Sequence, residues 1–210
     1  MIRPLTEWVL DTALNRLCGW IQSGLELSVA VNVSPRLLED HSIVEDVAKA
    51  LATSNADPAR LTLEITEGVA TSAAAGKAIH RLAEMGVRLS LDDFGTGYSS
   101  LVFLKRLPIH ELKIDRSFIK QVAVDPDASA IVRTAIGVGH NLGLRVIGEG
   151  VEEREAEAVL IEAGCDAVQG YLIGKPVPED EMTDLLESGR ELSGSPPGPP
   201  PMGREGSREG

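Results

Sequence analysis

The sequence predicts an α/β fold whose parallel strands curl into a TIM-like (β/α) barrel. Two observations lead to this fold class. Six short apolar runs alternate with helical segments along the 210 residues, which is the pattern of βαβ units and a parallel sheet. These runs are also short and interrupted by polar residues, which suits a barrel better than an open sheet. Hydrophobic residues make up 43% of the chain, enough for a substantial core.

The six strands are expected where aliphatic and β-branched residues are concentrated. They are residues 27–33, 61–66, 87–91, 111–114, 144–148 and 167–170. A closed barrel of this type has about eight strands, so six strands predict an incomplete barrel. Its first and last strands would then be unprotected edges.

The helices are expected where apolar residues recur every three or four positions. They are residues 4–23, 35–54, 71–85, 99–106, 127–142, 152–163 and 179–188. Apolar residues of the first helix lie on one stripe, namely Leu5, Trp8, Val9, Ala13, Leu17 and Trp20. Ser34 and Pro35 are typical of a helix start, so the second helix is expected to begin there. Residues 191–210 are rich in Pro, Gly and Ser and are expected to be a disordered tail.

Composition argues against several classes of protein. The formal net charge of −12 is unsuited to a surface that grips a nucleic-acid polymer, which requires clustered Lys and Arg. No apolar run approaches the ~18 residues of a membrane span. The two cysteines, Cys18 and Cys165, provide no disulfide framework, and reduced thiols are typical of a cytoplasmic protein. We therefore expect a cytoplasmic protein without a membrane partner.

Polar residues stand at the end of every predicted strand. They are Asn32, Glu64, Asp92 with Asp93, Lys113 with Asp115, Glu149 and Gln169. The carboxyl ends of barrel strands emerge on one face, so these side chains are expected to converge. Asn32, Glu64, Asp92, Asp93 and Glu149 offer only oxygen atoms, the ligands that Mg²⁺ and Mn²⁺ prefer. The adjacent aspartates could hold two ions for attack of water on a phosphodiester, with Lys113 orienting the water.

Six stretches of the sequence resemble, in order, the EAL-domain phosphodiesterases of cyclic di-GMP signalling. They are Val-Asn-Val-Ser at residues 31–34, Leu-Glu-Ile-Thr-Glu at 63–67, Asp-Asp-Phe-Gly-Thr-Gly-Tyr-Ser-Ser-Leu at 92–101, Lys-Ile-Asp-Arg-Ser-Phe at 113–118, Glu-Gly-Val-Glu at 149–152 and Gln-Gly-Tyr at 169–171. The resemblance implies hydrolysis of cyclic di-GMP to linear pGpG with two Mg²⁺ or Mn²⁺ ions, in a partial EAL domain covering residues 1–190.

The resemblance also implies roles for individual residues. The metal ligands would be Asn32, Glu64, Asp92, Asp93 and Glu149. Lys113 would position or activate the water, and Glu67 would steady the loop of residues 93–100, which in this family contributes to dimer contacts. Asp115, Glu152 and Gln169 would contact or support the substrate.

The sequence departs from the family pattern at its N-terminus. The family's first two strands precede the helix that opens this chain, and Glu-Ala-Leu occurs nowhere in the 210 residues. The glutamate of that motif is a metal ligand in the family, so its loss predicts weakened metal binding and impaired hydrolysis. Three interpretations stay open: a signalling enzyme completed by a second copy, a partner or upstream residues; an inactive cyclic di-GMP-binding or protein-interaction module; and a gene fragment.

Overall fold

The computed structural model describes residues 2–70, 72–96 and 104–188. The predicted tail at residues 191–210 lies outside the described residues, and so does most of the helix predicted at residues 99–106. No helix in the described ranges is long and apolar enough to cross a lipid bilayer.

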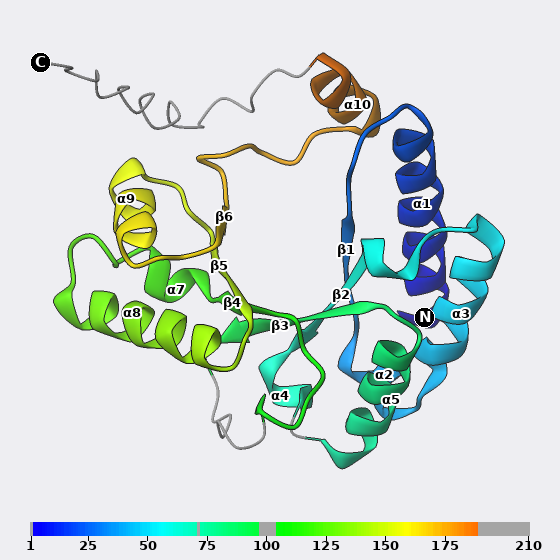
Figure 1. The fold of residues 1–210 in the computed structure, drawn as a ribbon, viewed down its shortest axis with the longest axis horizontal. Helices are drawn as coiled ribbons and strands as arrows, with labels where there is room; N and C mark the ends of the chain where they lie inside the picture. Colours follow the sequence, from blue (N-terminus) through cyan, green and yellow to red (C-terminus); the bar gives the residue numbers. More distant parts are fainter. Residues whose placement is uncertain (1, 71, 97–103, 189–210) are drawn as a thin grey trace, which may run out of the picture.

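Six parallel strands form one sheet in sequence order, as predicted. They are β1 (Val29–Asn32), β2 (Leu61–Thr66), β3 (Arg88–Phe94), β4 (Glu111–Ile114), β5 (Arg145–Glu149) and β6 (Ala167–Gln169). The sheet curls into part of a barrel (Figure 1), with β1 and β6 as its two edges. The predicted incomplete barrel of six strands is thereby confirmed.

Helices surround the curled sheet. They are α1 (Ile2–Gln22), α2 (Pro35–Glu39), α3 (Ser42–Ser54), α4 (Glu67–Ala70), α5 (Ala73–Glu84), α7 (Arg116–Ile119), α8 (Pro126–Asn141), α9 (Arg154–Glu162) and α10 (Glu179–Ser188), with a 3₁₀ turn at Pro58–Arg60. Helices α1, α2, α3 and α5 lie beside the first half of the sheet, and α7, α8 and α9 beside the second half (Figure 1).

Strand register divides the sheet into an apolar face and a polar face. Leu63 pairs with Leu89, and Leu91 pairs with Leu112; all four are fully buried. Alternate residues of the same strands point to the opposite face. By this pairing one row of that second face holds Asn32, Glu64, Ser90 and Glu111. Asp92, Lys113 and, on the neighbouring strand β5, Glu149 lie further along the same face. The apolar face meets the helices, and the polar face lines the inside of the curl.

Helix α1 packs with a face that only partly coincides with its apolar stripe. Its buried residues are Thr6, Leu10, Leu14 and Leu17. Leu5 and Trp8 also lie on the predicted stripe, but they are 54% and 64% exposed. The apolar residues in the N-terminal half of α1 form a wide face, and periodicity alone does not decide which of them meets the core.

We expect Leu14→Ala to lower the free energy of unfolding by about 3 kcal/mol, because Leu14 is fully buried and its loss leaves a cavity. Leu5→Ala on the same helix should cost less than about 1 kcal/mol, because that side chain remains largely in water. Urea denaturation of both variants checks the orientation of α1. Equal losses would contradict it.

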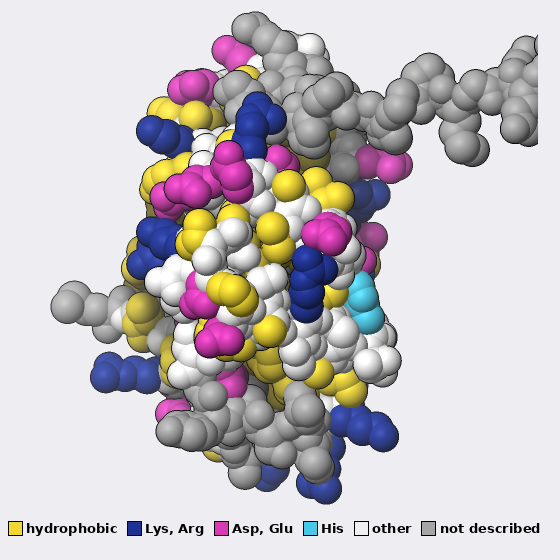
Figure 2. All heavy atoms as spheres, turned by 90° about the vertical axis from the view of Figure 1, so that its left-hand side faces the viewer, with side chains coloured by type: hydrophobic (Ala, Val, Ile, Leu, Met, Phe, Trp, Pro, Cys, Tyr) yellow, Lys and Arg dark blue, Asp and Glu magenta, His cyan; other side chains and the backbone are white. Residues whose placement is uncertain are grey.

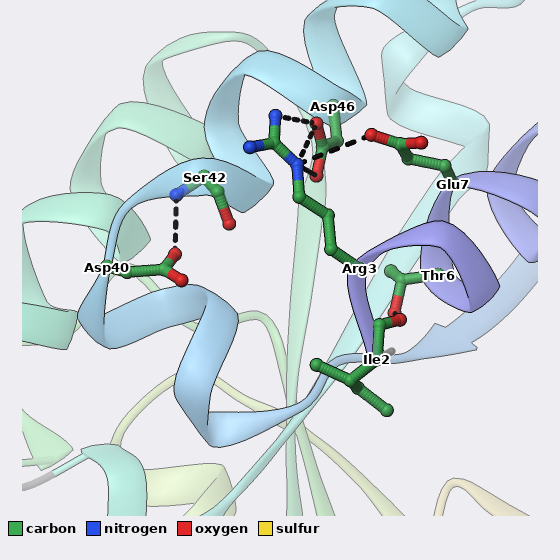
Figure 3. Close-up of polar contacts among 7 residues, drawn as sticks. All are labelled: Ile2, Arg3, Thr6, Glu7, Asp40, Ser42 and Asp46. Carbon is green, nitrogen blue, oxygen red and sulfur yellow. Dashed lines mark hydrogen bonds and ion pairs between the residues drawn. The ribbon is translucent and has the colours of Figure 1, made fainter.

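The segment predicted as one helix at residues 35–54 consists of two helices, α2 and α3. His41 between them has φ 63°, in the left-handed region, and Asp40 Oδ1 accepts a hydrogen bond from the backbone N–H of Ser42 at 2.9 Å (Figure 3). Asp side chains that bond a backbone group two residues on compete with helix formation. The chain therefore turns at His41 and restarts as α3.

Polar contacts tie the two ends of α1 to neighbouring helices. Arg3 Nε and Nη2 donate to both carboxylate oxygens of Asp46 on α3 at 2.7–3.2 Å (Figure 3). Near the other end, Trp20 Nε1 donates to Thr183 Oγ1 of α10 at 3.1 Å, and Arg16 pairs with Glu179. Helix α10 thus connects the β6 side of the fold to α1, across the gap between the two sheet edges (Figure 1).

The face formed by α8 and α9 carries charges of both signs. Acidic, basic and apolar side chains are interspersed over it in Figure 2. Arg133 Nη2 of α8 and Glu162 Oε2 of α9 form an ion pair of 3.0 Å there. The described part of this face does not present the clustered cations that grip a nucleic-acid backbone.

Candidate metal centre

A bulge in β3 brings the two adjacent aspartates to the same side of the sheet. The strand continues through Asp92 and Asp93 to Phe94, whereas the sequence predicted that it ends at Leu91. Leu91 pairs with Leu112 but Phe94 pairs with Ile114, so β3 holds one extra residue. Asp93 absorbs it with φ 57°, a left-handed conformation that Asp tolerates better than most residues. Strict alternation would have separated the two carboxylates.

Asp92, Asp93 and Glu149 form a compact cluster of carboxylates. One carboxylate oxygen from each lies within 4.8 Å of the other two. Glu149 reaches the cluster from the end of β5, two strands away from β3. Three hard oxygen donors so close together fit a divalent cation such as Mg²⁺ or Mn²⁺. The residues therefore match the metal chemistry that the strand ends predict.

The electrostatics of the cluster favour a cation. Burial raises the pKa of Asp93, and the charges of Asp92 and Asp115 raise it further. Burial likewise raises the pKa of Glu149, which also faces Asp92 and Glu64, although Lys113 opposes this rise. Repulsion between neighbouring carboxylates is thus one cause of the raised pKa values, and a bound cation would relieve that repulsion.

Lys113 joins three of the predicted ligands. Its side chain is 3% exposed, and Nζ lies 2.8 Å from Glu64 Oε1 and 3.6 Å from Asp92 Oδ1 and also contacts Glu149. Burial acts to lower the pKa of Lys113, but the hydrogen bonds that its ammonium group donates to Glu149 and Glu64 outweigh burial and raise the pKa above its ordinary value. Lys113 therefore stays charged and holds β2, β3 and β5 together at their carboxyl ends.

Asn32 lies at the margin of this group. It pairs in register with Glu64, but it stands on the edge strand β1 and its side chain is exposed. The structure thus brings Glu64, Asp92, Asp93 and Glu149 together around Lys113 and places Asn32 beside them at the sheet edge. Whether each residue binds metal stays a prediction.

Glu67 supports the backbone that follows the two aspartates. Its side chain is buried, and Oε2 accepts a hydrogen bond from the backbone N–H of Gly95 at 3.1 Å. Gly95 has φ 101°, a conformation that favours glycine. This hydrogen bond is of the kind that the predicted role of Glu67 in holding the loop of residues 93–100 requires. The role itself stays a prediction.

A pocket of about 480 Å³ opens beside the carboxylate cluster. Its lining consists of Asp93, Asp115, Arg116, Glu149, Gly150, Glu152, Gln169, Gly170 and Tyr171. The three residues predicted to contact substrate, Asp115, Glu152 and Gln169, are all among them. The sequence analysis assigned no role to the other two polar side chains of the lining, Arg116 and Tyr171. Both lie in stretches that resemble the EAL family: Arg116 directly follows Asp115, and Tyr171 is two residues after Gln169.

Asp115 also organises the local backbone. Burial acts to raise its pKa, but hydrogen bonds from the hydroxyl and backbone N–H of Ser117 lower the pKa overall. This bond from the Ser117 N–H, 2.9 Å long, caps the start of α7. The sequence analysis did not predict α7, because four residues are too few to show a helical period.

Comparison with known proteins identifies what this chain is similar to. The EAL domain family matches residues 1–176. The bifunctional diguanylate cyclase/cyclic di-GMP phosphodiesterase MucR of Pseudomonas aeruginosa is 40% identical over 87% of this chain and 27% of its own length. Cyclic di-GMP phosphodiesterase PdeR of Escherichia coli is 36% identical over 85% of this chain and 27% of its own length. The chain thus spans about a quarter of the length of these relatives.

Solved structures show the same similarity in three dimensions. The chain superposes on the P. aeruginosa MucR phosphodiesterase in complex with c-di-GMP with a TM-score of 0.82 and 42% identity, covering 86% of this chain and 74% of that one. The EAL domain of Mycobacterium smegmatis DcpA gives a TM-score of 0.82 and 38% identity, covering 89% and 85% of the two chains.

Proposed function

Because the chain belongs to the EAL domain family, we propose that it binds cyclic di-GMP and contributes to metal-dependent hydrolysis of this dinucleotide to linear pGpG. The observation that carries the proposal is the cluster of Asp92, Asp93 and Glu149 oxygens within 4.8 Å of one another, beside a pocket of nucleotide-binding size. Relatives named cyclic di-GMP phosphodiesterases and a solved c-di-GMP complex support the choice of substrate.

The metal would be held by oxygen atoms at the strand ends. Asp92, Asp93 and Glu149 are the ligands that already lie together, with Glu64 and Asn32 beyond them toward β1. Two Mg²⁺ or Mn²⁺ ions bound there would neutralise charge on the phosphodiester and activate a water for attack. The chain's own contribution is to hold these carboxylates at fixed positions before the substrate arrives.

Lys113 and the pocket residues would act on water and substrate. Lys113 offers three N–H donors between β2, β3 and β5, so it can orient a water or bond a phosphate oxygen once the carboxylates bind metal. Glu152 and Asp115 provide acceptors for the N–H groups of a guanine base, and the Gln169 amide provides both a donor and an acceptor. Glu67 would keep the Gly95 backbone in place.

Two wider features of the protein belong to this proposal. The free edges of β1 and β6 in the described chain would pair with further polypeptide, either a second copy or a partner, because exposed strand edges readily add strands. A cytoplasmic location is in keeping with the free thiols of Cys18 and Cys165.

The proposal is tested by incubating the purified chain with cyclic di-GMP and Mn²⁺ and separating pGpG by chromatography. We expect pGpG formation that EDTA abolishes, slower than that of the P. aeruginosa MucR phosphodiesterase assayed in parallel, because the 210 residues contain no Glu-Ala-Leu. Asp92→Asn should lower turnover at least ~100-fold, and Asp11→Asn, an exposed change on α1, should leave it unchanged. Binding of cyclic di-GMP without pGpG would reject the enzyme and favour the binding module.

A further inference from the structure

Helix α7 lies between the loops that follow the two strands of the carboxylate cluster. It begins directly after Asp115 at the end of β4, and β4 lies between β3, which bears Asp92 and Asp93, and β5, which bears Glu149. The loops following β3 and β5 each turn at a glycine with positive φ, Gly95 at 101° and Gly150 at 65°. Both turns pack against side chains of α7.

Phe118 fills the space beside Gly95. A Cβ atom built on Gly95 would lie 2.8 Å from Cε2 and 3.3 Å from Cζ of the Phe118 ring. The ring therefore occupies the volume that any other residue at position 95 would need. The backbone N–H of Gly95 is at the same time bound to Glu67 Oε2 at 3.1 Å. Gly95 is thus fixed by the aromatic ring and by the carboxylate, two residues beyond Asp93.

Arg116, also on α7, makes the corresponding contact with Gly150 in the loop that follows β5. A Cβ atom built on Gly150 would lie 2.5 Å from Arg116 Cβ and 3.5 Å from its Cα. Gly150 directly follows Glu149, so α7 touches the chain one residue from the third carboxylate of the cluster. Because protein interiors are close-packed, the thickness of α7 sets how far apart the two loops can stand.

We propose that Phe118 is a positioning residue that holds Asp92 and Asp93 at the separation from Glu149 required to share a metal ion. The inference rests on the proposed metal site. It assigns the role to an aromatic ring that acts through its contact with Gly95. Leucine at position 118 would be too short to fill the same volume, so the Gly95 turn and the bulge at Asp93 would gain freedom.

The test is the affinity of the purified chain for Mn²⁺ alone, measured by calorimetric titration without nucleotide. We expect Phe118→Leu to weaken Mn²⁺ binding by ~10-fold or more, the scale of losses when residues that orient ligands are removed. The Gly95 amide should also exchange its hydrogen faster than in the wild-type chain. Val122→Ala, a truncation of a buried residue just after α7, is the control for lost stability and should leave Mn²⁺ affinity unchanged.

A double substitution separates the effect of the contact between Phe118 and Gly95 from a general loss of stability. Gly95→Ala alone should also weaken Mn²⁺ binding, because the new methyl group meets the Phe118 ring. If the two residues act through that contact, Gly95→Ala and Phe118→Leu together should weaken binding less than the product of the single effects. The role of Phe118 would be overturned, and the proposed metal site left intact, by either of two results. One is that the two single losses of Mn²⁺ affinity multiply in the double variant. The other is that Phe118→Leu and Val122→Ala lose equal affinity. A wild-type chain that binds no Mn²⁺ would overturn the proposed site as well.

Discussion

Lys113→Met is expected to destabilise the metal-free chain by about 3 kcal/mol or more, since breaking a buried ion pair leaves uncompensated charge. Three carboxylates, Glu64, Asp92 and Glu149, lose their shared cation, and each is less than one fifth exposed. Mn²⁺ should restore part of the lost stability, because it binds the folded chain and replaces the missing charge. Turnover of cyclic di-GMP should fall at least ~100-fold, because the substitution removes the group that we propose orients the water.

The measurement is the thermal unfolding midpoint in EDTA and in excess Mn²⁺. We expect Mn²⁺ to raise the midpoint more in Lys113→Met than in the wild-type chain. Lys120→Met is the matched control: Lys120 is half exposed and lies 3.7 Å from Glu152, and exposed pairs contribute about 0–1 kcal/mol. A Lys113→Met midpoint equal to that of the wild-type chain in EDTA would contradict the structural role assigned to Lys113.

Asp93→Asn is expected to impair Mn²⁺ binding and turnover without loss of stability. Asparagine adopts the left-handed conformation that Asp93 has at φ 57°, so the bulge should survive. The substitution removes a charge that faces Asp92 and Asp115, and the free energy of unfolding should stay the same or rise by less than about 1 kcal/mol. Mn²⁺ affinity and turnover should fall at least ~10-fold, because one of the proposed carboxylate ligands is lost.

Asp93→Ala distinguishes the backbone from the carboxylate. Alanine lacks the side-chain oxygen and also tolerates the left-handed region poorly, so this variant should lose function and about 1 kcal/mol of stability. Urea denaturation and Mn²⁺ titration of both variants check the prediction. If Asp93→Asn unfolds as readily as Asp93→Ala, the charge at position 93 stabilises the fold, and the account of the bulge is wrong.

Much of the fold could be predicted because its signals are local. The six strands and their order follow from apolar runs that alternate with helices, and the convergence of polar residues follows from parallel strand direction. The errors arise where tertiary contacts decide. Leu5 and Trp8 share helical spacing with buried residues, yet α1 turns them to solvent. The break at His41 depends on a backbone conformation that periodicity does not reveal.

The candidate site was predicted in its composition but not in its geometry. Asp92 and Glu149 could be recognised as strand ends, because residue type and position suffice for that. The bulge at Asp93 could not, because it depends on the register between β3 and β4. The position of Phe118 against Gly95 could not either, since α7 is too short to show a pattern and the contact joins residues 23 positions apart.

The central claim is that Asp92, Asp93 and Glu149 hold a divalent cation beside the nucleotide pocket. The most direct test is anomalous diffraction at the manganese edge from crystals grown with Mn²⁺ and cyclic di-GMP. The account predicts an anomalous peak at coordination distance, ~2.0–2.3 Å, from oxygens of these three carboxylates, with the dinucleotide against Glu152 and Gln169. Nucleotide bound with no peak at the three carboxylates, or a peak held by other residues, would contradict it.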